Sequence, residues 1–245
     1  MDRQPDLFSS LASPVAPTDP LRAHASIVVA PASVRPEHQR LAVALPATLH
    51  LGTSSWAFPG WASIVYGGAT SEAVLARQGL TAYSQHPLLS SVAIDRSFYA
   101  PLTTAQFAEY AAQVPRAFRF VTKAPATVTD PLVREVRGKP TGANPDFLNA
   151  AKAIDEFLGP ALEGLGAKAG VLLFQLSPAP NLRTGSAVML ERLAPFLEAV
   201  CAEAHRSAAV IAIEVRDRSL VSPRLAEVLN TTGARYSFSI HGRMP

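Results

Sequence analysis

The sequence predicts an α/β fold of the (β/α) TIM-barrel type, and three observations lead to this prediction. Six short β-type runs alternate with segments that carry helix start signals, as in right-handed βαβ units of a parallel sheet. No glycine-rich phosphate turn follows the first run, which disfavours a doubly wound nucleotide-binding sheet. Polar residues stand at the end of nearly every run, where a barrel builds its sites.

The composition indicates one main globular domain. The chain has 245 residues and 48% hydrophobic content, which is enough to bury a sizeable core. A net charge of +3 is small for a nucleic-acid-binding protein, so this class is disfavoured. The single Cys201 excludes a disulfide framework and suits a cytoplasmic setting. No apolar run reaches the roughly 20 residues of a membrane span, and no signal peptide is recognised.

The chain divides into two parts. Residues 1–46 are rich in Pro and Ala without a sustained period, and predict a disordered extension. Residues 47–245 form the predicted barrel domain. Its six strands are expected at Thr48–Ser54, Ser91–Ser97, Phe118–Lys123, Gly170–Leu176, Ala209–Val215 and Tyr236–Ile240.

Helix start and stop signals stand between these runs. Thr103 and Gln106 have capping-box spacing, and Ser222-Pro223 opens a helix that should stop near Gly233. Asn144-Pro145 reads as an N-cap and first-turn pair. Helices are therefore expected at about 71–86, 103–114, from 144 onward, 186–205, and 222–233.

Only six strand units are visible, whereas an eight-stranded barrel needs two more. We therefore expect C-terminal units to be missing, with strands one and six exposing their pairing edges.

The strand ends carry the residues that could perform chemistry. Strand alternation predicts that Asp95, Ser97 and Tyr99 share one side, and that Glu214 and Arg216 share another. The other polar or aromatic residues at strand ends are Ser54 and Trp56 after the first strand, Lys123, Gln175, and His241 after the sixth.

Two interpretations of this cluster stay open. Lys123 could hold a substrate anion while Glu214 acts as a general base. Alternatively, the charges form a structural network, with Glu214 paired to Arg216, Lys123 or Arg96. Trp56 could stack on a ligand ring, although packing into the core is the reading we favour.

The histidines are not spaced as zinc ligands are, so we predict no zinc site. We also predict no cofactor, while a divalent metal held by carboxylates stays open as an alternative. Phosphate-loop, GxSxG and HExxH patterns are absent from the sequence, which removes the best-marked nucleotide, serine-hydrolase and zinc-protease readings.

Five ordered motifs resemble the YecE-like family, also called domain of unknown function 72. They are LGTSSWAFPGW, VAIDRSFYAPLT, FRFVTKAP, VLLFQLSP and AIEVRDRSL, within a resemblance that covers about Leu49 to Met244. The resemblance implies a TIM barrel without an established activity, and its motif positions carry Ser54, Trp56, Ser97, Tyr99, Lys123, Gln175, Glu214 and Arg216. Where that family commonly has an EFRH-type run, this chain reads Glu214-Val215-Arg216-Asp217, so a His-dependent role there is in doubt.

A second motif stands at the N-terminus. The stretch Gln4-Pro5-Asp6-Leu7-Phe8, with Gln4, Asp6, Leu7 and Phe8 as its binding residues, resembles the peptide by which bacterial DNA-replication and repair proteins dock on the sliding clamp. Five residues are a weak signal, and we favour a chance apolar pair.

We expect an enzyme that binds a small anionic or polar substrate at the barrel mouth, with hydrolase and isomerase or lyase as the candidate classes. The alternative is a non-catalytic protein linked to DNA metabolism and recruited through the N-terminal peptide.

Overall fold

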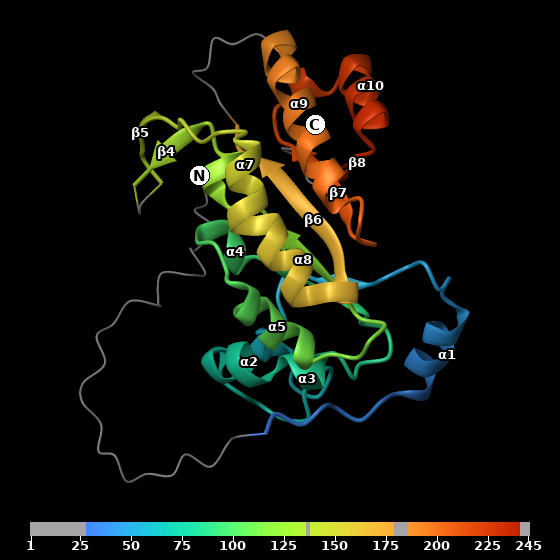
Figure 1. Cartoon of the computed structure of the whole chain (residues 1–245). Coiled ribbons are helices and arrows are strands. Elements are labelled where there is room, and N and C mark those ends of the chain that lie inside the picture. The colour runs from blue at the N-terminus through green and yellow to red at the C-terminus, as the bar shows by residue number, and fades with distance from the viewer. Residues whose placement is uncertain (1–27, 136–137, 179–185, 241–245) are drawn as a thin grey trace, which may run out of the picture.

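The computed structural model describes residues 28–135, 138–178 and 186–240 (Figure 1). Within them, six parallel strands form one sheet in the order β1-β2-β3-β6-β7-β8. Neighbouring strands of this sheet therefore follow one another along the chain. This is the arrangement of a TIM-type barrel, and it confirms the existence and order of the six predicted strands. The bounds differ most at the two edges, where β1 and β8 have two residues each and β8 shares only Tyr236 with the expected run Tyr236–Ile240. The strands are β1 (Gly52–Thr53), β2 (Ser91–Ile94), β3 (Arg119–Lys123), β6 (Ala169–Leu176), β7 (Val210–Val215) and β8 (Arg235–Tyr236).

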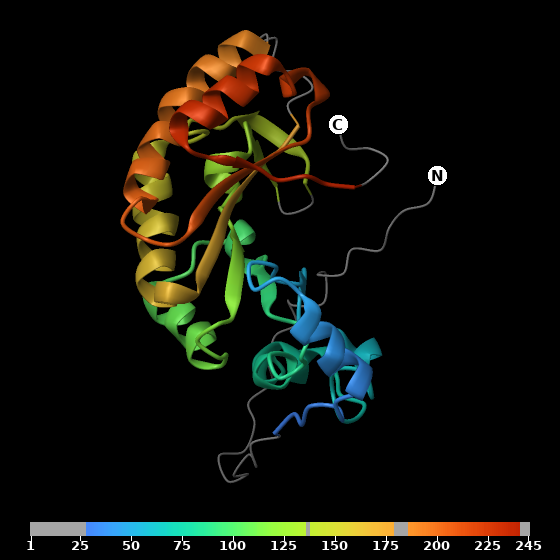
Figure 2. The same ribbon diagram turned by 90° about the vertical axis from the view of Figure 1, so that its right-hand side faces the viewer.

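Helices cover one face of this sheet. Figure 2 shows α5, α8, α9 and α10 gathered on that side, whereas the opposite face lacks a comparable helical layer in the described part of the chain. The helices are α1 (Pro36–Ala44), η1 (Pro59–Trp61), α2 (Glu72–Gln78), α3 (Leu80–Tyr83), α4 (Arg96–Tyr99), α5 (Thr104–Ala112), α6 (Ala126–Thr129), α7 (Ala150–Ala153), η2 (Ile154–Leu158), α8 (Gly159–Leu165), η3 (Gly166–Lys168), α9 (Ser186–Ala204), η4 (Arg218–Leu220) and α10 (Pro223–Thr232).

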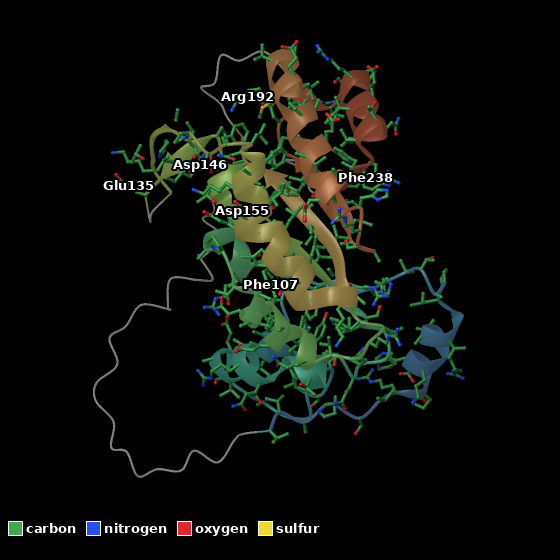
Figure 3. The ribbon with its side chains drawn as sticks, viewed as in Figure 1. Phe107, Glu135, Asp146, Asp155, Arg192 and Phe238 are labelled. Carbon is green, nitrogen blue, oxygen red and sulfur yellow. The ribbon has the colours of Figure 1, made fainter. Side chains whose placement is uncertain are left out.

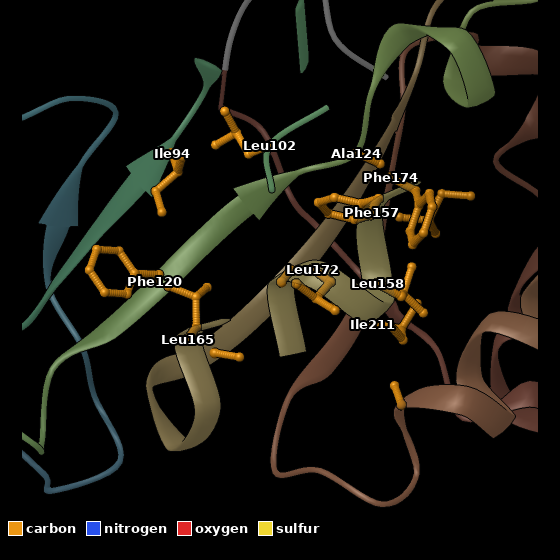
Figure 4. Packing of buried hydrophobic residues seen from close by; sticks show 14 of the residues in the cluster. Ile94, Leu102, Phe120, Ala124, Phe157, Leu158, Leu165, Leu172, Phe174 and Ile211 are labelled. Carbon is orange, nitrogen blue, oxygen red and sulfur yellow. The ribbon is translucent and has the colours of Figure 1, made fainter. Parts of the chain in front are cut away.

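The main core lies between the sheet and these helices (Figure 4). The Phe174 ring of β6 packs edge-on against Phe157 of η2 at 5.7 Å and against Phe196 of α9 at 5.2 Å between ring centroids. All three side chains are buried, so β6 has one face fully covered. Such aromatic side chains each bury about 150 to 250 Å² and fix helices on a sheet.

Several local signals are confirmed. The Thr103 hydroxyl accepts from the Gln106 amide, and the Gln106 side chain accepts from the Thr103 amide, which completes the capping box of α5. The Ser222 hydroxyl caps α10, and Gly233 ends that helix with a φ of 81°, which glycine adopts without strain.

The predicted N-cap at Asn144 is wrong. Its side chain donates instead to the carbonyl oxygens of Thr127 and Asp130, at 2.8 and 2.7 Å, and accepts from the Asp146 amide. The helix begins after Asn149, whose side chain accepts from the Lys152 amide. A short polar side chain serves a turn and a helix cap equally well, and here the turn uses it.

Other differences concern elements without a local signal. Part of the predicted extension, Pro36–Ala44, forms helix α1. None of its residues is buried, so the sequence needs no apolar period there and gives no helix signal. Gly79 divides the helix expected at 71–86 into α2 and α3. The loop after β3 contains the antiparallel hairpin β4 (Leu132–Arg134) and β5 (Pro140–Ala143). Among the described helices, none is both long and apolar enough to cross a membrane.

Candidate functional site at the carboxyl ends of the strands

Lys123, Gln175 and Glu214 lie on the same face of the sheet. Gln175 and Glu214 are register partners on β6 and β7, while Lys123 pairs in register with Leu173, two residues before Gln175. Side chains of register partners, and of residues two apart on a strand, point to one side. This side is opposite to the buried Phe174, and therefore faces away from the helical layer. Strand spacing and rise place the Lys123 and Glu214 Cα atoms roughly 12 Å apart.

Lys123 is paired with Asp95, which follows β2. The Lys123 Nζ lies 3.2 Å from the Asp95 Oδ1, and the two side chains are about a quarter exposed, at 24% and 29%. The Asp95 Oδ1 is shielded from solvent and receives no hydrogen bond of good geometry from the described residues. The two groups are thus held by charge, and the ammonium protons can turn toward a third partner.

Glu214 is paired with Arg216 at the end of β7. The Arg216 Nε donates to the Glu214 Oε1 at 3.2 Å; the Glu214 side chain is 11% exposed and that of Arg216 42%. The sequence left Arg216, Lys123 and Arg96 open as partners of Glu214, and the structure shows the ion pair with Arg216. Gln175 beside it is buried at 7% exposure, and no hydrogen bond joins its side chain to another described residue. Its amide nitrogen and oxygen are not among the side-chain atoms shut off from solvent without a partner, so they can exchange water for a ligand.

Asp95, Ser97 and Tyr99 do not share a side as predicted. The strand ends at Ile94 and α4 begins at Arg96, so strand alternation does not extend to these residues. Ser97 is fully buried, and its hydroxyl donates to the carbonyl oxygens of Ile94 and Lys123, at 3.0 and 2.6 Å. Tyr99 is 69% exposed, with its ring edge-on to Phe98. Ser97 therefore connects the ends of β2 and β3.

Trp56 belongs to the core, as the packing interpretation expects. Its indole N–H donates to the Leu75 carbonyl oxygen at 3.1 Å, its ring packs edge-on to Tyr110, and its backbone carbonyl accepts from the Tyr66 hydroxyl. Burial raises the pKa of the Tyr66 hydroxyl far above its usual value, so it stays a donor. Ser54, beyond β1, is exposed.

The remaining predicted residues lie outside the described part of the chain. These are His241 in the site and Gln4, Asp6, Leu7 and Phe8 in the N-terminal peptide.

The structure adds a buried carboxylate that the sequence does not single out. Asp130 follows α6 and accepts from the Arg134 Nε at 2.7 Å and from the Leu132 amide at 2.9 Å. The Ser177 amide at the end of β6 donates to the Thr129 carbonyl next to it. These bonds fix the base of the β4–β5 hairpin beside the site. In the sequence, this position is marked only by the Asp130-Pro131 dipeptide, which indicates a turn.

Metal-binding side chains do not converge in the described ranges: no three His, Cys, Asp or Glu side chains there could hold an ion together. A cavity of about 380 Å³ lies between α9 and α10, lined by Glu198, Cys201, His205, Thr231 and their neighbours. These residues precede β7 and β8, so the cavity is at the other end of the sheet from Lys123 and Glu214. Burial raises the pKa of the Cys201 thiol, which keeps it a poor nucleophile.

A parallel sheet whose strands follow one another in sequence, with polar side chains at their carboxyl ends, defines a TIM-type α/β protein. The family described as "Protein of unknown function DUF72" matches residues 50–240, and the chain belongs to it. No curated protein matches the chain.

Two solved structures are similar to it. A DUF72 family protein of Enterococcus faecalis has 20% identity and a TM-score of 0.50, with 76% of this chain and 59% of that chain covered. A DUF72 family protein of Thermotoga maritima has 19% identity and a TM-score of 0.45, with 76% and 64% covered. This chain thus spans less than two thirds of the length of these proteins, and the first likeness supports the fold alone.

Proposed function

We propose that the chain is an enzyme that binds a small polar or anionic substrate between Lys123 and Glu214. One observation carries this proposal: Lys123, Gln175 and Glu214 share the sheet face opposite the helical layer, at the carboxyl ends of three adjacent strands. In TIM-type folds, sites are built at this end of the sheet.

The groups have complementary chemical roles. The Gln175 amide both donates and accepts, so it can orient a substrate hydroxyl or carbonyl. The Glu214 carboxylate can accept a proton, and Arg216 at 3.2 Å holds it in place. The Lys123 ammonium can stabilise negative charge that develops on a substrate oxygen. Together they suit proton abstraction next to a carbonyl, or hydrolysis.

A thermal-shift screen of the full chain tests this proposal with sugars, sugar phosphates, carboxylates and divalent metals as probes. A ligand at 100 times its Kd should raise the Tm by about 5 to 10 °C. The shift should fall in Lys123→Ala and Glu214→Gln. It should persist in two matched controls that break ion pairs on the helical side, Lys152→Ala (pair with Asp146) and Glu191→Gln (pair with Arg224).

The same screen distinguishes the alternative of a recruited binding protein. If no probe shifts the Tm, while binding to a sliding clamp is lost in Leu7→Ala and Phe8→Ala, the enzyme proposal fails. A shift that is equal in all four ion-pair variants would also contradict a site at the strand ends.

A further inference from the structure

The charged side chains on the sheet face opposite the helices stand in pairs of opposite sign. Among the described residues there, Lys123 faces Asp95 at 3.2 Å and Arg216 faces Glu214 at 3.2 Å. Each cation therefore already has a carboxylate within contact distance. The unpaired polar group between the two pairs is the neutral amide of Gln175.

Other cations near this face do not change the balance. Arg235 is in register with Ala212 and Leu173, and therefore shares the face, but its Nη1 donates to the carbonyl oxygens of Gly233 and Ala234 before β8. The Arg119 Nη1 likewise donates to carbonyls that precede β3. Arg96 and Arg218 are exposed on α4 and η4, where solvent and salt screen them.

An anion would meet repulsion at either pair. A phosphate that approaches Lys123 comes within reach of the Asp95 carboxylate, and one that approaches Arg216 comes within reach of Glu214. Asp95 and Glu214 are only 29% and 11% exposed, so water screens this repulsion less than at an open surface. A hydroxyl group, in contrast, can donate to a carboxylate and accept from the paired cation or from Gln175.

We propose that the substrate of this site is a neutral, polyhydroxylated molecule such as a sugar or polyol, and not a phosphate ester or a carboxylic acid. This inference rests on the proposed function, because it names the substrate class of the same site. Two carboxylates, two cations and one amide offer alternating acceptors and donors across roughly 12 Å, which is the length of one or two sugar rings with their hydroxyls.

Inorganic phosphate is the direct probe. In the wild-type chain it should bind weakly or not at all by calorimetry. Asp95→Asn leaves Lys123 without its carboxylate and should bind phosphate at least about tenfold more tightly than the wild type. Glu214→Gln should do the same through Arg216. The matched control Glu191→Gln removes the carboxylate paired with Arg224 between α9 and α10 in the helical layer, and should show no such gain.

The second arm compares neutral sugars and polyols with their phosphate esters and sugar acids in the thermal-shift screen. The inference predicts larger shifts for the neutral members, little changed between 0.05 and 0.5 M NaCl. If the wild type binds phosphate as tightly as Asp95→Asn does, or if phosphorylated members bind best and depend on Lys123, the neutral-substrate inference is overturned while the proposed site stands. If no member binds and phosphate affinity is the same in all variants, both proposals fall.

Discussion

Ser97 joins the ends of two strands through a single hydroxyl. It is fully buried and donates to the carbonyl oxygens of Ile94 and Lys123, so it fixes the backbone that carries the site lysine. Ser97→Ala removes the hydroxyl donor from these two carbonyl oxygens. It should lower the free energy of unfolding by about 1 to 3 kcal/mol in urea titrations.

A matched serine controls for the loss of a hydroxyl alone. Ser84 donates to the Thr81 carbonyl oxygen in a solvent-accessible turn, and Ser84→Ala should change stability by no more than about 0.5 kcal/mol. Equal losses in the two variants would contradict a role for Ser97 in joining β2 and β3.

His86 should make the fold sensitive to acid. Its imidazole lies 5.2 Å from the His38 ring of α1, and its Nδ1 accepts from the Leu88 amide. Burial first, and the charge of His38 second, lower the pKa of His86. The unfolded chain therefore binds more protons, and stability present above a pH of about 6.5 is lost as the pH falls through and below that value.

The measurement is the Tm of wild type and His86→Asn between pH 7.5 and 5.5. The variant should lose less stability over this range, because the group that resists protonation is gone. His205→Asn, which changes an exposed histidine, should behave like the wild type. Identical pH profiles of wild type and His86→Asn would contradict this account.

At the scale of elements, α5 and α8 pack closely through a glycine. A Cβ atom at Gly164 would overlap with the Thr104 carbonyl oxygen and with the Phe107 Cβ atom. Phe107 is fully buried and lies where these two helices meet (Figure 3). Because one obstacle is backbone, the helices must separate, and Gly164→Ala should destabilise the protein by about 1 to 3 kcal/mol despite the better helix propensity of alanine.

Gly142→Ala is the matched control for this substitution. Nothing lies within 4 Å of a Cβ atom at Gly142 in β5, so its Tm should stay close to that of the wild type. If Gly164→Ala raised the Tm instead, the close approach of α5 and α8 would be wrong.

The whole sheet should exchange its amide protons unevenly. β2, β3, β6 and β7 are paired on both sides, whereas β1 and β8 are each paired on one side among the described strands. Helix α1 has no buried residue. Hydrogen exchange followed by mass spectrometry should therefore show the slowest exchange in these four central strands, faster exchange in β1 and β8, and the fastest in α1. Protection of α1 equal to that of β6 would contradict this picture.

The sequence by itself determined the order and parallel pairing of the six strands, because alternation of strand and helix signals leaves few topologies. It also determined the capping box of α5, which depends on residues three apart. Strand alternation correctly predicted that the Glu214 and Arg216 side chains lie on the same side, because β7 is extended up to Val215.

Only the tertiary structure decided which charges meet and which polar groups are internal. Asp95 pairs with Lys123 across two strands, Ser97 turns inward because α4 replaces the strand, and Asn144 joins a turn instead of capping a helix. Each outcome depends on contacts between segments far apart in sequence. Local periodicity and capping rules describe neighbours along the chain, so they cannot choose among partners that only the fold brings together.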